Sequence, residues 1–137
     1  MRVLLVLLAM LGFSTPAGAF SDAERAAVQN AIEQQLQAFL RDDGATAYSF
    51  AAPSIKSMFP TEEIFMQMVQ RGYPQVYRPR AYQFQELVEK GGHLEQTVEI
   101  VDGDGVFWSA LYTLERQPDG SWKITGCYIV KKPGGVA

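Results

Sequence analysis

Apolar side chains recur every three or four positions in the first half of the chain, which predicts helices. The first helix is expected to begin at the capping sequence Ser21–Glu24 and to end near Arg41–Gly44. Asp43 then caps a second, shorter helix, which must end before Pro53. A third helix opens with Thr61 as its cap. The apolar stripe of the first helix consists of Val28, Ile32, Leu36, Phe39 and Leu40.

The second half of the chain alternates between apolar and polar positions, which predicts antiparallel strands. Four strands are expected over residues 82–90, 93–101, 106–116 and 121–131. The turns between them are Gly91-Gly92, Asp102-Gly103-Asp104-Gly105 and Pro118-Asp119-Gly120. Helices followed by such a meander predict an α+β fold, with three N-terminal helices packed on the concave face of a curved four-stranded antiparallel sheet.

The segment GYPQVYRPR, residues 72–80, joins the third helix to the first strand. Proline disfavours helical geometry in the residue before it, and this segment contains Pro74 and Pro79. It is therefore predicted to be a stiff, extended connection, with Tyr73 and Tyr77 packed on the core.

The N-terminus has a pattern of its own. Arg2 is followed by an apolar run over residues 3–13 and by small residues that end in Ala17-Gly18-Ala19. The run is too short to span a bilayer comfortably. This pattern predicts a signal peptide over residues 1–19, cleavage after Ala19, and a single domain over residues 20–137 that is periplasmic or secreted and makes no stable membrane insertion after cleavage. An uncleaved membrane anchor is the alternative.

Composition narrows the class of protein. The chain has 137 residues, 47% of them hydrophobic, which is enough apolar material for a single hydrophobic core. Its formal net charge of −3 disfavours nucleic acid or an anionic membrane as a partner. With one histidine, one cysteine and no HxxxH or CxxC spacing, no metal site and no cofactor are predicted. The Asp102–Gly105 turn resembles the start of a calcium loop, but Val106 follows it and no glutamate closes such a loop.

Cys127 is the single cysteine, so it has no partner for an internal disulfide. It is expected to be a small apolar residue in the last strand. An intermolecular disulfide or a reactive thiol is the alternative.

Alternation divides the side chains of each strand between a core face and an outer face. The core face is expected to carry Glu86 on the first strand and, on the last strand, Trp122, Ile124, Gly126, Tyr128 and Val130. The outer face is expected to carry an apolar patch of Leu87, Phe107, Leu111, Cys127 and Ile129. Such a patch predicts a homodimer or a docking site for another envelope protein, with Phe107 and Leu111 central. The alternative is that residues 132–137 or a shift in strand register cover it.

Aromatic residues supply the candidates for a ligand pocket. They are Tyr48, Tyr73, Tyr77, Trp108 and Tyr112, with Arg78 available to hold an anionic group at the mouth. Plain core packing is the alternative for the aromatic residues, and ordinary solvation is the alternative for Arg78.

Glu86 is the candidate catalytic residue, because a carboxylate on a core face has a raised pKa unless it is paired. It would be the general base of a small isomerase or dehydratase, with Tyr48 or Tyr112 as proton donor. A strand end, a bulge that reverses the alternation, or an ion pair with Arg78 or Arg80 is the alternative. The lack of a catalytic histidine and of a second inward acid favours a small-ligand-binding or protein-interaction module instead.

Three segments resemble a known family: FAAPSIKSMF (50–59), FMQMVQRGYPQVYRPR (65–80) and ALYTLERQPDGSWKITGC (110–127). They look like an exported bacterial family described as domain of unknown function 4864, and the likeness spans nearly all of the chain after residue 19. Helices first, an aspartate after the first helix and a long bent sheet also resemble the NTF2-like cone. The resemblance implies this fold and an export route. It brings no established activity, cofactor or catalytic residue.

Overall fold

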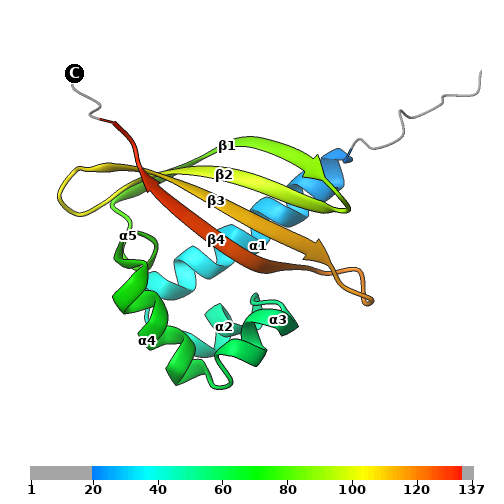
Figure 1. The fold of residues 1–137 in the computed structure, drawn as a ribbon, viewed down its shortest axis with the longest axis horizontal. Coiled ribbons are helices and arrows are strands. Elements are labelled where there is room, and N and C mark those ends of the chain that lie inside the picture. The colour runs from blue at the N-terminus through cyan, green and yellow to red at the C-terminus, as the bar shows by residue number, and fades with distance from the viewer. Residues whose placement is uncertain (1–19, 134–137) are drawn as a thin grey trace, which may run out of the picture.

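The computed structural model describes residues 20–133, and in it the helices lie on one side of a curved sheet (Figure 1). Within these residues the helices are α1 (Asp22–Leu40), α2 (Gly44–Ser49), α3 (Pro53–Met58), α4 (Glu62–Gly72) and α5 (Pro74–Tyr77). The strands are β1 (Ala81–Lys90), β2 (His93–Val101), β3 (Phe107–Arg116) and β4 (Trp122–Lys131). They pair antiparallel in the order β1-β2-β3-β4. The predicted α+β class is confirmed, with two short helices, α3 and α5, added to the three expected.

The predicted signal peptide, residues 1–19, lies outside the described residues. Within residues 20–133, no helix is both long enough and apolar enough to cross a membrane.

Side-chain caps set where α1 and α4 begin, as the sequence predicts. The Glu24 N–H donates to Ser21 Oγ at 3.1 Å, and the Ser21 N–H donates to Glu24 Oε1 at 3.2 Å. This reciprocal pair satisfies two of the N–H groups that a helix start leaves free. Thr61 caps α4 by accepting from the Ile64 N–H at 3.2 Å.

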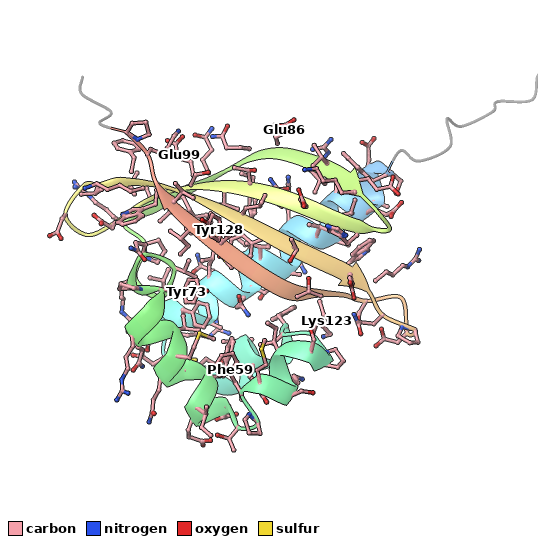
Figure 2. The ribbon with its side chains drawn as sticks, viewed as in Figure 1. Phe59, Tyr73, Glu86, Glu99, Lys123 and Tyr128 are labelled. Carbon is pink, nitrogen blue, oxygen red and sulfur yellow. The ribbon has the colours of Figure 1, made fainter. Side chains whose placement is uncertain are left out.

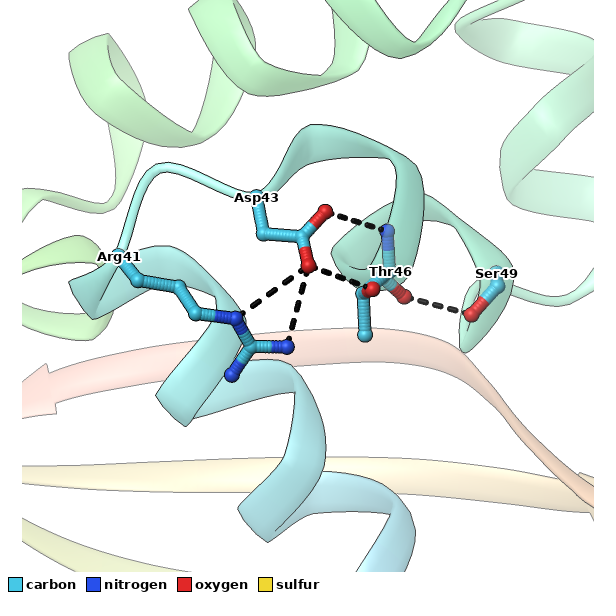
Figure 3. A network of polar contacts seen from close by, with 4 residues as sticks. All are labelled: Arg41, Asp43, Thr46 and Ser49. Atoms are coloured by element: carbon cyan, nitrogen blue, oxygen red, sulfur yellow. Dashed lines mark hydrogen bonds and ion pairs between the residues drawn. The ribbon is translucent and has the colours of Figure 1, made fainter.

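The junction between α1 and α2 is organised by Asp43 (Figure 3). Its carboxylate accepts from the Thr46 N–H at 3.1 Å and from the Thr46 hydroxyl at 2.7 Å, which caps α2. The Arg41 guanidinium donates to the same carboxylate at 3.1 Å. These bonds fix the angle at which the chain leaves α1, so they determine where α2 packs.

The expectation of an extended connection across residues 72–80 is wrong. Pro74 is the first residue of α5, a position where the N–H that proline lacks has no helical partner in any case. The residues before the two prolines are non-helical, Tyr73 with φ −137° and ψ 52° and Arg78 with φ −136° and ψ 63°, and the chain stays non-helical from Arg78 to the start of β1. The prolines therefore bracket one helical turn instead of preventing it.

A bulge in β1 reverses the predicted faces of the strand beyond Phe84. Phe84 pairs with Val98 and Leu87 pairs with Gln96, so two β1 residues, 85 and 86, oppose a single residue of β2. The extra residue turns Leu87 toward the helices, where its exposed fraction is 6%, and leaves Glu86 exposed on the outer face (Figure 2). The expected inward position of Glu86 and outward position of Leu87 are both wrong.

A second bulge reverses the faces of β4. Gly126 pairs with Thr113 and Ile124 pairs with Leu114, so Thr125 has no opposite residue in β3. Beyond it, Cys127 and Ile129 pair with the inward residues Tyr112 and Ala110, so both face the helices. Tyr128 and Val130, expected in the core, instead lie on the outer face with exposed fractions of 68% and 48%.

The middle strands keep the predicted alternation and form one wall of the core. On β2 and β3 the buried residues are Leu94, Gln96, Val98, Ile100, Ala110, Tyr112 and Leu114. The other wall is the apolar stripe of α1, from which Val28, Ile32, Leu36 and Phe39 are buried. Among the short helices, α3 packs against β4 and α5 packs against β2, while α2 packs against α1 and α4 (Figure 1).

Candidate functional site: a cavity between the helices and β4

A cavity of about 290 Å³ lies between the short helices and the β3–β4 side of the sheet. Its walls are mainly aromatic and aliphatic. Residues on the helical side include Phe39, Ile55, Phe59, Phe65, Met68, Val69, Tyr73 and Val76, and those on the sheet side include Tyr112, Ile124 and Cys127. Met58 also lines the cavity and is largely exposed, so it marks the mouth.

The chain between α2 and α3 pairs with β4 and so holds the helical wall in place. The Ala52 N–H donates to the Ile124 carbonyl at 2.8 Å, and the Ile124 N–H donates to the Phe50 carbonyl at 2.9 Å. Ala51 forms an isolated parallel bridge with Ile124 between these two bonds. This backbone contact anchors α3 beside the sheet, and α4 then closes the cavity with Phe65, Met68 and Val69.

Few polar side chains reach the cavity, and among residues 20–133 no Asp, Glu, His, Lys or Arg lines it. Gln35 is buried, and its amide donates to the Ala47 carbonyl at 3.1 Å. Tyr112 is 1% exposed, and its hydroxyl has no hydrogen-bond partner among the described residues. The lining of the cavity is therefore uncharged among the described residues.

Tyr112 and Cys127 face the cavity from directly paired positions on β3 and β4. Burial raises the pKa of Tyr112 well above its ordinary value of 10.0, and the neighbouring thiol adds to the increase. Burial also raises the pKa of Cys127, to about 12, although the nearby Tyr112 hydroxyl partly opposes this. The thiol is close enough to influence the phenol, yet the two groups do not reach ordinary hydrogen-bond geometry. Cys127 keeps some accessible surface because it faces a cavity, even though protein surrounds it.

Of the predicted pocket residues, the structure brings Tyr73 and Tyr112 to the cavity. Tyr48 lies behind the cavity wall, where its hydroxyl donates to the Phe59 carbonyl at 2.6 Å and its ring packs on Phe65 with a centroid distance of 5.4 Å. Trp108 lies near the end of the sheet, where its Nε1–H donates to Asp102 Oδ2 at 2.9 Å.

Tyr77 and Arg78 also lie apart from the cavity, in a polar cluster with Asp42. The Tyr77 hydroxyl donates to Asp42 Oδ1, and Arg78 Nη2 donates to the same oxygen at 2.6 Å. Arg78 also donates to the carbonyl of Phe39 at the end of α1. Arg78 is thus occupied by the protein itself and does not hold a group at the cavity mouth.

The interpretation of Glu86 as a general base fails on geometry. Its carboxylate is on the outer face of β1, whereas the cavity is on the helical side of β4 (Figure 2). Sequence reasoning also missed Cys127 as a cavity residue. The signal that could have found it is Gly126, because a glycine inside a strand often marks a bulge, and this bulge turns Cys127 inward.

The outer face of the sheet carries a second feature, the outer patch, made of Phe107, Leu111, Tyr128 and Val130. Leu111 pairs with Tyr128 across β3 and β4, so these side chains are neighbours. Phe107, Tyr128 and Val130 are all exposed. Of the five residues predicted for this patch, Phe107 and Leu111 are on the outer face. Leu87, Cys127 and Ile129 instead face the helices because of the two bulges.

Comparison with known proteins assigns a family and a fold. Residues 21–137 match the family described as domain of unknown function (DUF4864), and the chain belongs to that family. A crystal structure of an NTF2-like protein of unknown function from Silicibacter pomeroyi DSS-3 is similar with a TM-score of 0.57 and 16% identity, covering 82% of this chain and 100% of that one. A second, from Shewanella baltica OS155, has a TM-score of 0.59 and 9% identity and covers 85% of this chain and 99% of that one. None of the curated proteins matches. The domain is therefore NTF2-like.

Proposed function

We propose that this member of the DUF4864 family is a binding module that takes one small, predominantly apolar molecule into the cavity between α4 and β4. The observation that carries the proposal is the cavity itself, about 290 Å³ lined by aromatic and aliphatic side chains. An engineered apolar cavity of about 150 Å³ holds benzene, so by proportion this volume suits about 12 non-hydrogen atoms. It is also near the lower end of the range, about 300 Å³, for natural ligand pockets.

The physical chemistry of the lining favours binding over catalysis. Acid–base catalysis works best with a titratable group whose pKa lies near the operating pH. The titratable residues in the lining are Tyr73, Tyr112 and Cys127, and burial raises the pKa of each. Burying about 200 Å² of apolar ligand surface contributes about 5 kcal/mol. The translational and rotational freedom that the ligand loses on binding offsets part of that energy, so a purely apolar ligand is expected to bind weakly.

Naphthalene is a suitable first probe, and ligand-observed NMR is the measurement. The wild type is expected to bind it, and Val69→Phe is expected to abolish binding, because the larger ring fills the cavity that Val69 lines. Val130→Phe is the matched control, since the same change on the exposed outer face leaves the cavity intact. Undiminished binding by a folded Val69→Phe protein would contradict the proposal. Native mass spectrometry of protein purified from its own host then gives the mass of the natural ligand.

A second function, contact with another protein, is supported by the outer patch. Contiguous exposed apolar side chains on a soluble domain usually mark a contact surface, and Phe107, Tyr128 and Val130 are 38%, 68% and 48% exposed. We propose a second copy of the chain as the occupant, with another envelope protein as the alternative. In sedimentation velocity, the wild type should show concentration-dependent dimers. Tyr128→Glu should be monomeric, whereas Ile64→Glu, at an exposed site on α4, should still dimerise.

We also propose that the domain works outside the cytoplasm, in the periplasm or secreted. The support is the sequence of residues 1–19, with a charged start, an apolar run and a small-residue end. N-terminal sequencing of the exported protein should begin at Phe20. A protein that keeps Met1 and remains in the membrane would contradict cleavage.

A further inference from the structure

Gln35 is the one amide side chain that lines the cavity among residues 20–133, and only 4% of it is exposed. Its Nε2 donates to the Ala47 carbonyl of α2 at 3.1 Å. This bond fixes which end of the amide is the oxygen, because only the N–H end of an amide can donate to a carbonyl. The other end, Oε1, accepts no hydrogen bond from any described residue, so Gln35 keeps one acceptor without a partner.

The unpaired Gln35 oxygen is accessible from the cavity. Among the described residues, two side-chain oxygens are fully buried and without a partner, Gln75 Oε1 and the Tyr112 hydroxyl. Gln35 Oε1 also lacks a partner but is not fully buried, so it accounts for part of the 4% of Gln35 that remains accessible. Ile32 and Leu36, which flank Gln35 on the buried face of α1, are both 0% exposed, so this surface opens into the cavity and not to bulk solvent.

The other polar side chains of the lining do not serve this oxygen. The Thr125 hydroxyl donates to a hydroxyl of β3 at 2.9 Å, and the Tyr112 hydroxyl is fully buried beside the Cys127 thiol. Tyr73 is only half-buried, so water can satisfy its hydroxyl. An acceptor that is buried without a partner costs about 1–3 kcal/mol, so the partner of Gln35 Oε1 must come from the contents of the cavity.

The charge state of the site restricts what that partner can be. No Asp, Glu, His, Lys or Arg among residues 20–133 lines the cavity. Burial raises the pKa values of Tyr73, Tyr112 and Cys127, so all three are neutral at pH 7. An ionised ligand would therefore lose its hydration without an opposite charge to replace it.

We infer that the ligand is a neutral, largely apolar molecule with one hydrogen-bond donor, a hydroxyl or an amide N–H, which donates to Gln35 Oε1. This inference rests on the proposed ligand-binding function and names the class of ligand for the same cavity. The amide of Gln35 then bridges the ligand and α2, since one end accepts from the ligand while the other donates to Ala47. The aromatic and aliphatic walls contact the apolar body of the ligand.

Four probes with the same number of non-hydrogen atoms separate the possibilities: 2-phenylethanol, benzyl methyl ether, propylbenzene and 2-phenylethylamine. The first carries a hydroxyl donor, the second carries an acceptor and no donor, and the third carries neither. The fourth carries an ammonium group, which is a donor but is ionised at pH 7.

Gln35→Met keeps the length of the side chain and removes its oxygen. It is expected to weaken binding of 2-phenylethanol about five- to tenfold relative to benzyl methyl ether and propylbenzene, the equivalent of one hydrogen bond. The comparison between probes matters because the variant also loses the bond to Ala47, and any change in the shape of the cavity acts on all three neutral probes. 2-Phenylethylamine is expected to bind the wild type at least about tenfold more weakly than 2-phenylethanol, because its ammonium has no anionic partner.

Gln34→Met is the matched control, since it makes the same change on the exposed face of α1 and should alter no affinity. Titration followed by NMR chemical shifts measures the affinities. A second measurement uses the wild type alone: the chemical shift of the Gln35 side-chain carbonyl carbon should change with 2-phenylethanol more than with the ether or propylbenzene, because accepting a hydrogen bond polarises the carbonyl.

The outcomes distinguish this inference from the function on which it rests. If the wild type binds none of the three neutral probes, the proposed binding function fails and the inference fails with it. If they bind and Gln35→Met affects all three equally, binding stands and the donor to Gln35 is overturned. A loss of 2-phenylethanol affinity that appears in Tyr73→Phe and not in Gln35→Met would move the hydrogen bond to Tyr73 and also overturn it. Comparable binding of 2-phenylethylamine would overturn the neutral class.

Discussion

The Tyr77 hydroxyl donates a hydrogen bond to the Asp42 carboxylate, which joins α5 to the turn that ends α1. Arg78 donates to the same carboxylate, and its guanidinium lies 4.2 Å from the centre of the Tyr77 ring. Asp42 has a left-handed backbone, with φ of 57°, so the chain reverses sharply at this point. Because α5 carries Val76 into the cavity wall, this cluster fixes one side of the proposed site.

The cluster should make stability depend on pH. The hydrogen bonds from Tyr77 and Arg78 hold the pKa of Asp42 below its ordinary value of 3.8. A depressed pKa in the folded state stabilises the fold above about pH 4, and this contribution is lost as the pH falls through the folded pKa. The urea midpoint of the wild type should therefore exceed that of Asp42→Asn at pH 7, and the difference should shrink at pH 3.

Asparagine tolerates the left-handed backbone, so Asp42→Asn removes the charge without adding strain. Glu86→Gln is the control, because it removes an exposed carboxylate of the outer face and should follow the wild type at both pH values. A constant difference between wild type and Asp42→Asn would mean that the carboxylate charge has no part in the effect.

Tyr73, which precedes α5, and Tyr77, its last residue, should contribute differently to the free energy of unfolding. Tyr77 is 8% exposed and its ring centroid lies 5.7 Å from that of Phe39, so Tyr77→Ala should cost about 3–5 kcal/mol. Tyr73 is half-buried and faces the cavity, so it has fewer contacts to lose, and Tyr73→Ala should cost less, about 1–2 kcal/mol. Chemical unfolding at pH 7 measures both. Equal costs would contradict the different burial of the two rings.

Cys127 should react slowly while the protein is folded. Burial raises its pKa to about 12, and the thiolate is the reactive form. Ellman's reagent at pH 8 should therefore modify the folded protein at least about tenfold more slowly than the protein in urea, where the thiol has an ordinary pKa near 8.5. Naphthalene in the cavity should slow the folded reaction further. Equal rates in the two states would show a solvated thiol.

Local signals account for the parts of the fold that the sequence predicts well. Ser21 with Glu24, and likewise Asp43 and Thr61, satisfy free N–H groups within one helical turn, so their roles can be read without the rest of the molecule. The glycine turns behave similarly, since Gly91 and Gly92 both adopt positive φ between β1 and β2. Pro74 was misinterpreted because proline both ends helices and begins them, and only the chain around it decides which.

The candidate site was harder to predict because its geometry depends on two bulges. One extra residue exchanges the faces of everything beyond it. As a result, Glu86 lies outside the core, where it was predicted, and Cys127 lies in the cavity wall instead of on the outer face. Gly126 directly follows the extra residue of β4, and a glycine inside a strand often marks a bulge, whereas residues 84–87 of β1 contain no glycine or proline.

The bulge in β4 can be tested by removing its extra residue. Deletion of Thr125 would leave Ile124 opposite Leu114 and Gly126 opposite Thr113 in a regular ladder, so Cys127 and Ile129 should still face the helices. Thr125→Val keeps the residue count and loses the 2.9 Å hydrogen bond to the Thr113 hydroxyl, so it should cost about 1 kcal/mol. The deletion loses the same hydrogen bond and also straightens the strand, so it should cost more than Thr125→Val.

Urea unfolding gives the two costs, and the reaction of Cys127 with Ellman's reagent shows which way the strand faces. In Thr125→Val the thiol should remain as slow to react as in the wild type, because Cys127 still faces the cavity. The thiol of the folded deletion variant should be equally slow, because Cys127 keeps its place opposite Tyr112. A folded deletion variant whose thiol reacted as fast as in urea would mean that Cys127 had turned outward, and Thr125 would then not be the extra residue of β4.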